Sequence, residues 1–136
     1  MDLGARDFNA KSELIMKSSE KEMAALIKIY VCELPAKAAE IQQAAETAIH
    51  QLGKRETPRW AVLESLVHKL AGSAGTYGFY AISTLARTLE DRISNGSFAK
   101  IPPDEQALEL RGWLESFLTV ARKTATDGES VNKEAA

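Results

Sequence analysis

The sequence predicts an all-α protein, an antiparallel up-and-down four-helix bundle with an additional short helix at the N-terminus. Apolar residues recur at spacings of three and four along most of the chain, and no stretch alternates apolar and polar residues as a strand does. Glycine and proline are few and mostly separate the periodic segments. Long helices with short connections are typical of such bundles, and 136 residues suit one domain.

The first half of the chain predicts a short helix over residues 10–17, followed by a long one. Ser19, with Glu22 three positions later, has the pattern of a capping box and predicts the start of the long helix. Pro35 removes a backbone donor, so it should kink or end this helix. The apolar pattern then resumes and continues as far as Leu52.

The second half predicts three more helices. Thr57 and Pro58 have the residue types of an N-cap and a first helical position, and their helix should end near Gly78. The next helix should stop at residues 95–96, an Asn-Gly pair, and the last follows a proline-containing loop. The apolar positions expected on the last helix are Leu108, Leu110, Trp113, Leu114, Phe117, Leu118 and Ala121.

The chain is expected to divide into an N-terminal segment (residues 1–18), the bundle (19–124) and a disordered polar tail (125–136). A net charge of −2 without blocks of like charge disfavours nucleic acid as a partner. Because no membrane span or signal peptide is evident, a cytoplasmic location is expected. The single cysteine, Cys32, excludes an internal disulfide framework, and its apolar neighbours predict a packed thiol.

A histidine and three glycines stand inside one expected helix, in the stretch LVHKLAGSAGTYGF of residues 66–79. At about 100° per residue, the apolar positions gather within about 60° of Leu63, whereas His68 falls about 140° away and should face solvent. Glycine inside a helix costs roughly 1 kcal/mol relative to alanine. Gly72 and Gly75 share the face of His68, so this face is predicted to be bare enough for a partner to approach the imidazole. A solvated surface histidine, and a glycine at 75 that only ends the helix, are the simpler alternatives.

Glu90 is predicted to be the neighbour of His68 on the following helix. If the chain reverses at residues 77–79, residues equally distant from the reversal lie level, and these two are such a pair. A carboxylate there could accept a hydrogen bond from one ring nitrogen, fix the tautomer and direct the other nitrogen outward. The alternative is that Glu90 is merely solvated.

The motif HKLAGSA of residues 68–74, with Gly78 ten residues after the histidine, resembles the signature of histidine-containing phosphotransfer domains of multistep two-component phosphorelays. The similarity covers roughly residues 19–98, and the last helix completes the expected bundle. Outside the motif it rests on Leu34, Pro35, Leu85, Leu89 and Glu90.

The resemblance implies that His68 accepts a phosphoryl group from a receiver domain's aspartyl phosphate and passes it to another receiver. It further implies that Gly72 keeps the approach clear and that Glu90 orients the imidazole. The family often carries lysine three residues after the histidine, where this chain has Ala71. Lys69 lies about 100° further round the helix. The phosphoryl group on His68 therefore lacks a cation beside it, unless the Lys69 side chain bends toward it or the partner supplies one.

The resemblance leaves three functions open: a phosphotransfer module of a relay, a substrate domain of a chemotaxis-type kinase, and a bundle that binds receivers without transfer. The short chain favours the first. With no nucleotide-binding loop and no metal-ligand spacing, the protein is expected to be a phosphoryl carrier without cofactor rather than an autonomous enzyme. The divalent metal would belong to the receiver. The expected partners are receiver domains or a hybrid histidine kinase, bound transiently by a monomer. Docking is expected to involve Ala61, Glu64, Ser65, Lys69, Ala71, Gly72, Gly75 and Thr76.

Overall fold

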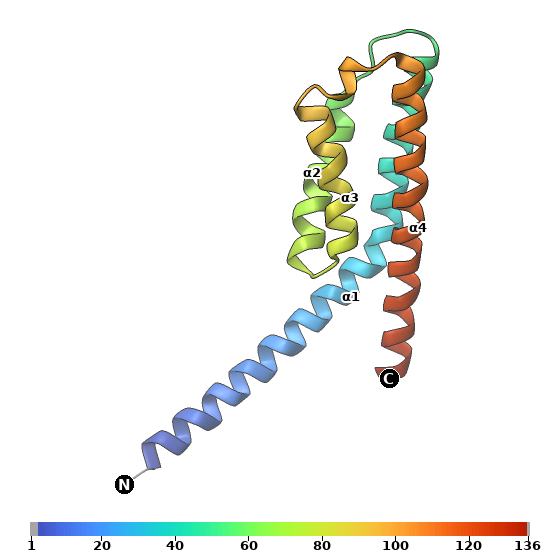
Figure 1. Ribbon diagram of the computed structural model, residues 1–136. Coiled ribbons are helices and arrows are strands. Elements are labelled where there is room, and N and C mark those ends of the chain that lie inside the picture. Colours follow the sequence, from blue (N-terminus) through green and yellow to red (C-terminus); the bar gives the residue numbers. More distant parts are fainter. Residues whose placement is uncertain (1–2, 136) are drawn as a thin grey trace.

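The computed structural model describes the backbone of residues 3–135 and the side chains of residues 19–127. It consists of α1 (Leu3–Gly53), α2 (Trp60–Thr76), α3 (Tyr80–Ser94), the single turn of 3-10 helix η1 (Phe98–Lys100) and α4 (Pro103–Ala135). No β-strand occurs between residues 3 and 135, so the predicted all-α class is confirmed. Figure 1 shows the chain running up α1, back along α2, up α3 and back along α4.

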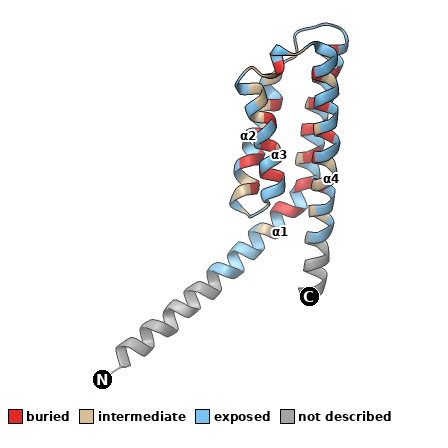
Figure 2. Cartoon of the chain, viewed as in Figure 1, coloured by how far each residue is buried: buried red, intermediate tan, exposed pale blue. Residues whose placement is uncertain are grey.

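The four helices share one apolar core. α1 packs mainly against α4, and α2 mainly against α3, so the fold joins two helix pairs. Figure 2 shows the buried residues on the sides of the helices that face one another. Each helix contributes side chains that are almost wholly buried, and each such side chain contributes about 1.5–3 kcal/mol of hydrophobic free energy. The largest of them are Leu34, Ile41, Leu63, Val67, Ile82, Leu89, Leu110 and Phe117.

α1 is one continuous helix, which corrects two expectations, a separate helix over residues 10–17 and a helix start at Ser19. The helix begins at Leu3, so residues 10–17 form no separate helix and the Ser19 capping pattern lies inside α1. Pro35 lies inside α1, so of its two expected effects, a kink or an end of the helix, the end does not occur. The proline is exposed, while Leu34 before it and Ala38 after it are buried, so packing on both sides maintains the helix. α1 is bent where it leaves the bundle (Figure 1), and an internal proline is the usual cause of such a bend.

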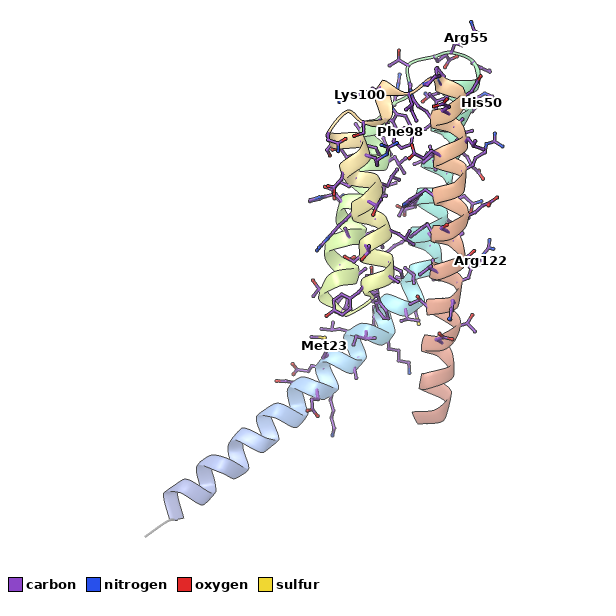
Figure 3. All side chains as sticks on the ribbon, in the orientation of Figure 1. Met23, His50, Arg55, Phe98, Lys100 and Arg122 are labelled. Carbon is purple, nitrogen blue, oxygen red and sulfur yellow. The ribbon has the colours of Figure 1, made fainter. Side chains whose placement is uncertain are left out.

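The described part of α1 before Tyr30 extends beyond the end of the bundle (Figure 1). Tyr30 is the first buried residue among the described side chains of α1. It is buried because the α2–α3 turn packs on its ring through Tyr77 and Phe79, with ring centroids 5.0 and 5.7 Å away. Met23, which stands apart from the bundle in Figure 3, and Leu26 are 44% and 46% exposed although the apolar pattern includes them. Side chains before residue 19 lie outside the described residues.

The tail predicted to be disordered, residues 125–136, falls mostly outside the residues whose side chains are described. The backbone of α4 continues through Ala135. Ala125 lies half-buried beside Pro35, where both line a shallow groove between α1 and α4. The described backbone is therefore helical over residues 125–135, where a disordered tail was expected.

The connections position the α2–α3 hairpin with small departures from expectation. α2 starts at Trp60 rather than at Pro58, because Arg59 has a non-helical backbone (φ −87°, ψ 83°) and its N–H donates to Gln51 Oε1 of α1 at 3.0 Å. The turn into α3 uses Gly78 at a φ of +85°, a conformation that favours glycine. α3 ends at Ser94 with Asn95 as its C-cap, as predicted.

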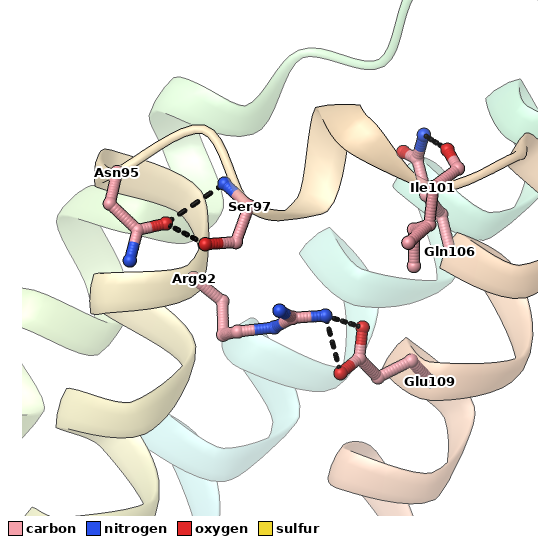
Figure 4. Close-up of polar contacts among 6 residues, drawn as sticks. All are labelled: Arg92, Asn95, Ser97, Ile101, Gln106 and Glu109. Carbon is pink, nitrogen blue, oxygen red and sulfur yellow. Dashed lines mark hydrogen bonds and ion pairs between the residues drawn. The ribbon is translucent and has the colours of Figure 1, made fainter.

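At the opposite end of the bundle, polar contacts tie α3 to α4 (Figure 4). Arg92 forms an ion pair with Glu109, and Gln106 donates to the backbone oxygen of Ile101 at 2.8 Å. Phe98 of η1, in the connection between α3 and α4, is buried and packs on Trp60 of α2, with ring centroids 5.1 Å apart. These contacts hold the far end of the α2–α3 hairpin against the other pair of helices.

Two further apolar residues, besides Met23 and Leu26, lie outside the core contrary to expectation. Leu108 is 73% exposed, because the buried stripe of α4 follows Leu110, Leu114, Phe117 and Ala121, and Leu108 falls on the other face. Cys32 is exposed rather than packed, since its neighbours in α1 turn toward the core and leave it outside. None of the described helices has the length and apolar character needed to cross a membrane.

Candidate functional site

His68 lies in the middle of α2 and faces solvent, as the helical phase predicts. Its side chain is 71% exposed, and its Nδ1 lies 2.6 Å from Oε1 of Glu90 on α3. A carboxylate only accepts hydrogen bonds, so Nδ1 is the donor and carries the proton. The expected pair is therefore present in the structure. In the neutral ring, Nε2 then has its lone pair free and directed away from Glu90.

His68 belongs to a stripe of α2 residues that face α3 in one antiparallel register. Ser94 donates to Glu64 Oε1 at 2.8 Å one turn before the histidine. One turn after it, the backbone oxygen of Ala71 accepts a hydrogen bond from Ser83 Oγ, also at 2.8 Å. The imidazole thus lies at the solvent edge of the α2–α3 contact, which is why a carboxylate of α3 reaches it.

Two residues predicted to face a partner instead face α3. Ala71 is only 3% exposed, so its predicted place on the docking surface is wrong. At Gly75, a Cβ atom would lie 3.2 Å from Ser83 Oγ, so the missing side chain allows α3 to come close. The reason is that α2 packs more extensively against α3 than against α1, which turns its buried stripe toward Ala71.

Gly72 is the glycine that does leave the surface bare. It is exposed, and a Cβ atom added there would meet nothing within 4 Å. Its backbone oxygen accepts a hydrogen bond from Thr76 Oγ1 at 2.9 Å. Glu64 is partly buried, and its carboxylate accepts the hydrogen bond from Ser94. The other predicted docking residues are exposed; they are Ala61, Ser65, Lys69 and Thr76.

Lys69 lies on the flank of α2 that faces α1, away from Glu90. It lines a groove there together with Lys37, Glu40 and Ser73. Behind the groove, Ser73 Oγ and the Tyr30 hydroxyl are 2.9 Å apart and share a hydrogen bond. Burial raises the pKa of Tyr30 while this hydrogen bond lowers it, and burial is the larger effect. This contact fixes α2 to α1 on the side opposite the histidine pair.

Sequence reasoning missed two residues of α3 that border the site. Ser83 bonds Ala71 across the α2–α3 contact, and Arg87 places its Nη2 atom 3.7 Å from where a Cβ of Gly75 would be. Ser83 lies seven residues before Glu90 and Arg87 lies three before it, so all three share one face of α3. This spacing could have identified Ser83 and Arg87 as neighbours of the site. Among the described residues, no group of three His, Cys, Asp or Glu side chains could hold a metal ion.

The geometry provides a positioned nucleophile and little else. The ring is fixed through Nδ1, Nε2 is open to solvent, and Gly72 one turn later offers no side chain to obstruct an approaching group. An imidazole held in this way suits attack on an electrophilic centre that a partner supplies. The arrangement therefore defines a class of protein: a helical bundle that presents one exposed, oriented histidine.

The family comparison gives this class its name. Residues 25–122 match the model of the Hpt domain, and because they make up most of the chain, the protein belongs to the Hpt domain family. The resemblance read from the motif is thus confirmed, with the last helix included. The family implies histidine phosphotransfer in two-component systems, through interaction with receiver domains and kinases. The comparisons with curated proteins and with solved structures give no significant match.

Proposed function

We propose that the protein carries a phosphoryl group on Nε2 of His68 within a phosphorelay, taking it from the aspartyl phosphate of one receiver domain and giving it to the aspartate of another. The observation that supports this most strongly is the exposed imidazole whose Nδ1 is bound by Glu90 at 2.6 Å. The open surface at Gly72 adds the access that a receiver needs.

In the proposed transfer, the Nε2 lone pair of neutral His68 forms the new N–P bond. The P–O bond to the receiver's aspartate breaks, and its electron pair leaves with the aspartate carboxylate. The imidazole gains positive charge as the N–P bond forms, and the Glu90 carboxylate hydrogen-bonded to Nδ1 stabilises that charge. The second transfer reverses these steps onto another aspartate. Positioning and charge neutralisation account for most of the catalysis in such reactions.

The remaining parts of the reaction are assigned to the partner. We propose that this chain uses no cofactor and that the receiver holds the divalent metal. Docking is proposed over the exposed part of α2 around His68, at Ala61, Ser65, Gly72 and Thr76. Because His68 and Glu90 come from one chain, a monomer suffices. The contact should be transient and at the small end of interface sizes, since a relay must release its partner.

A transfer assay tests the proposal. The protein is mixed with a purified receiver that carries labelled aspartyl phosphate, and acid-labile label on the protein is followed with time. We expect label to move to the protein and then to a second, unlabelled receiver. Binding of receivers without label would favour the non-transferring bundle, and labelling by a kinase with ATP but by no receiver would favour the kinase-substrate domain. Either outcome would overturn the relay.

Glu90→Ala is expected to slow transfer several-fold without abolishing it, because Glu90 orients the ring and breaks no P–O bond. Mutation of such a positioning partner typically costs less than removal of the reacting group itself. In nitrogen-detected NMR of the neutral ring, the variant should gain the tautomer protonated at Nε2. Glu109→Ala, which removes the carboxylate bound to Arg92 elsewhere on the bundle, is the control and should leave the tautomer unchanged. An unaltered tautomer in Glu90→Ala would contradict the orienting role.

A further inference from the structure

A phosphoryl group on His68 would enter a surface that already carries negative charge. Glu90 is bonded to the other nitrogen of the same ring, and Glu64 lies one turn earlier on the same stripe of α2. A phosphoryl group adds a charge of about −1.5 to −2 near neutral pH. A cation within reach of Nε2 would offset this repulsion. The basic side chains beside the site are Lys69 on α2 and Arg87 on α3.

Lys69 is poorly placed for this role. Its side chain lines the groove between α1 and α2, beside Lys37 and Glu40, whereas Glu90 approaches His68 from the α3 side. Position 71, three residues after the histidine, is buried against α3 and holds alanine. Neither residue of α2 therefore presents a cation on the flank that carries Glu90.

Arg87 approaches the same flank from α3. In the register that sets His68 level with Glu90 and Gly75 level with Ser83, Arg87 is level with position 71. It is thus three residues, or about 4.5 Å of helical rise, from the level of the histidine. Its guanidinium rests over Gly75, with Nη2 3.7 Å from the site of a Cβ. No carboxylate among the described side chains, residues 19–127, forms an ion pair with it.

We propose that Arg87 binds the phosphoryl group on His68. The inference rests on the proposed function, since it needs His68 to be phosphorylated. The guanidinium would turn from Gly75 across Gly72 toward the phosphoryl oxygens, and neither glycine has a side chain in its path. The planar fork of N–H donors matches such oxygens well. Arg87 supplies from α3 the positive charge that α2 lacks at position 71.

The test uses phosphoramidate as a small phosphoryl donor, so no receiver is needed. The second ionisation of the protein-bound phosphoryl group is followed by phosphorus NMR across pH. An opposite charge within a few ångströms favours the dianion, so Arg87→Ala should raise this pKa by about half a unit to one unit. Arg87→Lys should recover part of the difference. Lys69→Ala, the matched control on the other flank, should shift it less.

Three outcomes would overturn the proposal: no difference between Arg87→Ala and the wild type, a shift in Lys69→Ala that equals or exceeds it, or no labelling of His68 by phosphoramidate. Helical circular dichroism of each variant verifies the fold, which should persist because Arg87 is exposed. A failed transfer from receivers, with the shift in Arg87→Ala intact, would contradict the relay and leave this role standing.

Discussion

His68→Gln is expected to abolish phosphoryl uptake, with a loss of at least about a hundredfold in the initial rate, because the amide offers no nucleophilic nitrogen in place of Nε2. The fold should be unaffected. The histidine side chain is 71% exposed, so its replacement removes no core contact, and glutamine is a good helix former. The measurement is acid-labile label after mixing with a phosphorylated receiver or with phosphoramidate, together with thermal unfolding of the same preparation.

The chain offers a matched control in His50, its other histidine. His50 is exposed near the end of α1, at a distance from the α2–α3 hairpin, and Figure 3 shows it at the loop end of the bundle. His50→Gln should take up label as the wild type does. Label that persists in His68→Gln and disappears in His50→Gln would show that His50 carries the phosphoryl group, and it would overturn the proposed site.

The position of His68 and its pairing with Glu90 could be predicted because each depends on one simple regularity. The helical phase of α2 relative to Leu63 placed the histidine outside the core, and the register of a short hairpin placed Glu90 beside it. Both regularities survive small errors in helix boundaries. The two-residue error at the start of α2 left the phase unchanged, because the hydrogen bond from the Arg59 backbone N–H to Gln51 Oε1 affects only where the helix begins.

The roles of Ala71 and Gly75 could not be predicted, because they depend on which neighbour α2 packs against most closely. The apolar pattern gives the centre of the buried stripe only within a residue or so, and the extensive contact with α3 moves that centre toward Ala71. The continuity of α1 is a similar case. Pro35 is a local signal for a break in the helix, whereas the buried residues on both sides of it make tertiary contacts, and this packing keeps α1 continuous there.

Two glycines one turn apart should therefore respond in opposite ways to the same substitution. Gly75→Leu would drive a side chain into Ser83 and Arg87 of α3, and overpacking of this kind typically costs about 1–3 kcal/mol of unfolding free energy. Gly72→Leu meets nothing within 4 Å, and replacing a helix-interior glycine gains up to about 1 kcal/mol. Denaturant unfolding of both variants measures the difference.

The substitution that is harmless to stability, Gly72→Leu, should nevertheless impair phosphoryl transfer. Leucine at position 72 would stand beside the imidazole on the exposed face, so transfer from a receiver should fall at least about tenfold, the effect of losing about 1.4 kcal/mol of transition-state stabilisation. Labelling by phosphoramidate should change little, because so small a donor passes the new side chain. Gly72→Ala, with one added carbon, should give an intermediate rate with the receiver. A Gly72→Leu protein that is stable and fully active with receivers would show that docking avoids this face of α2, and the bare surface at Gly72 would need another cause.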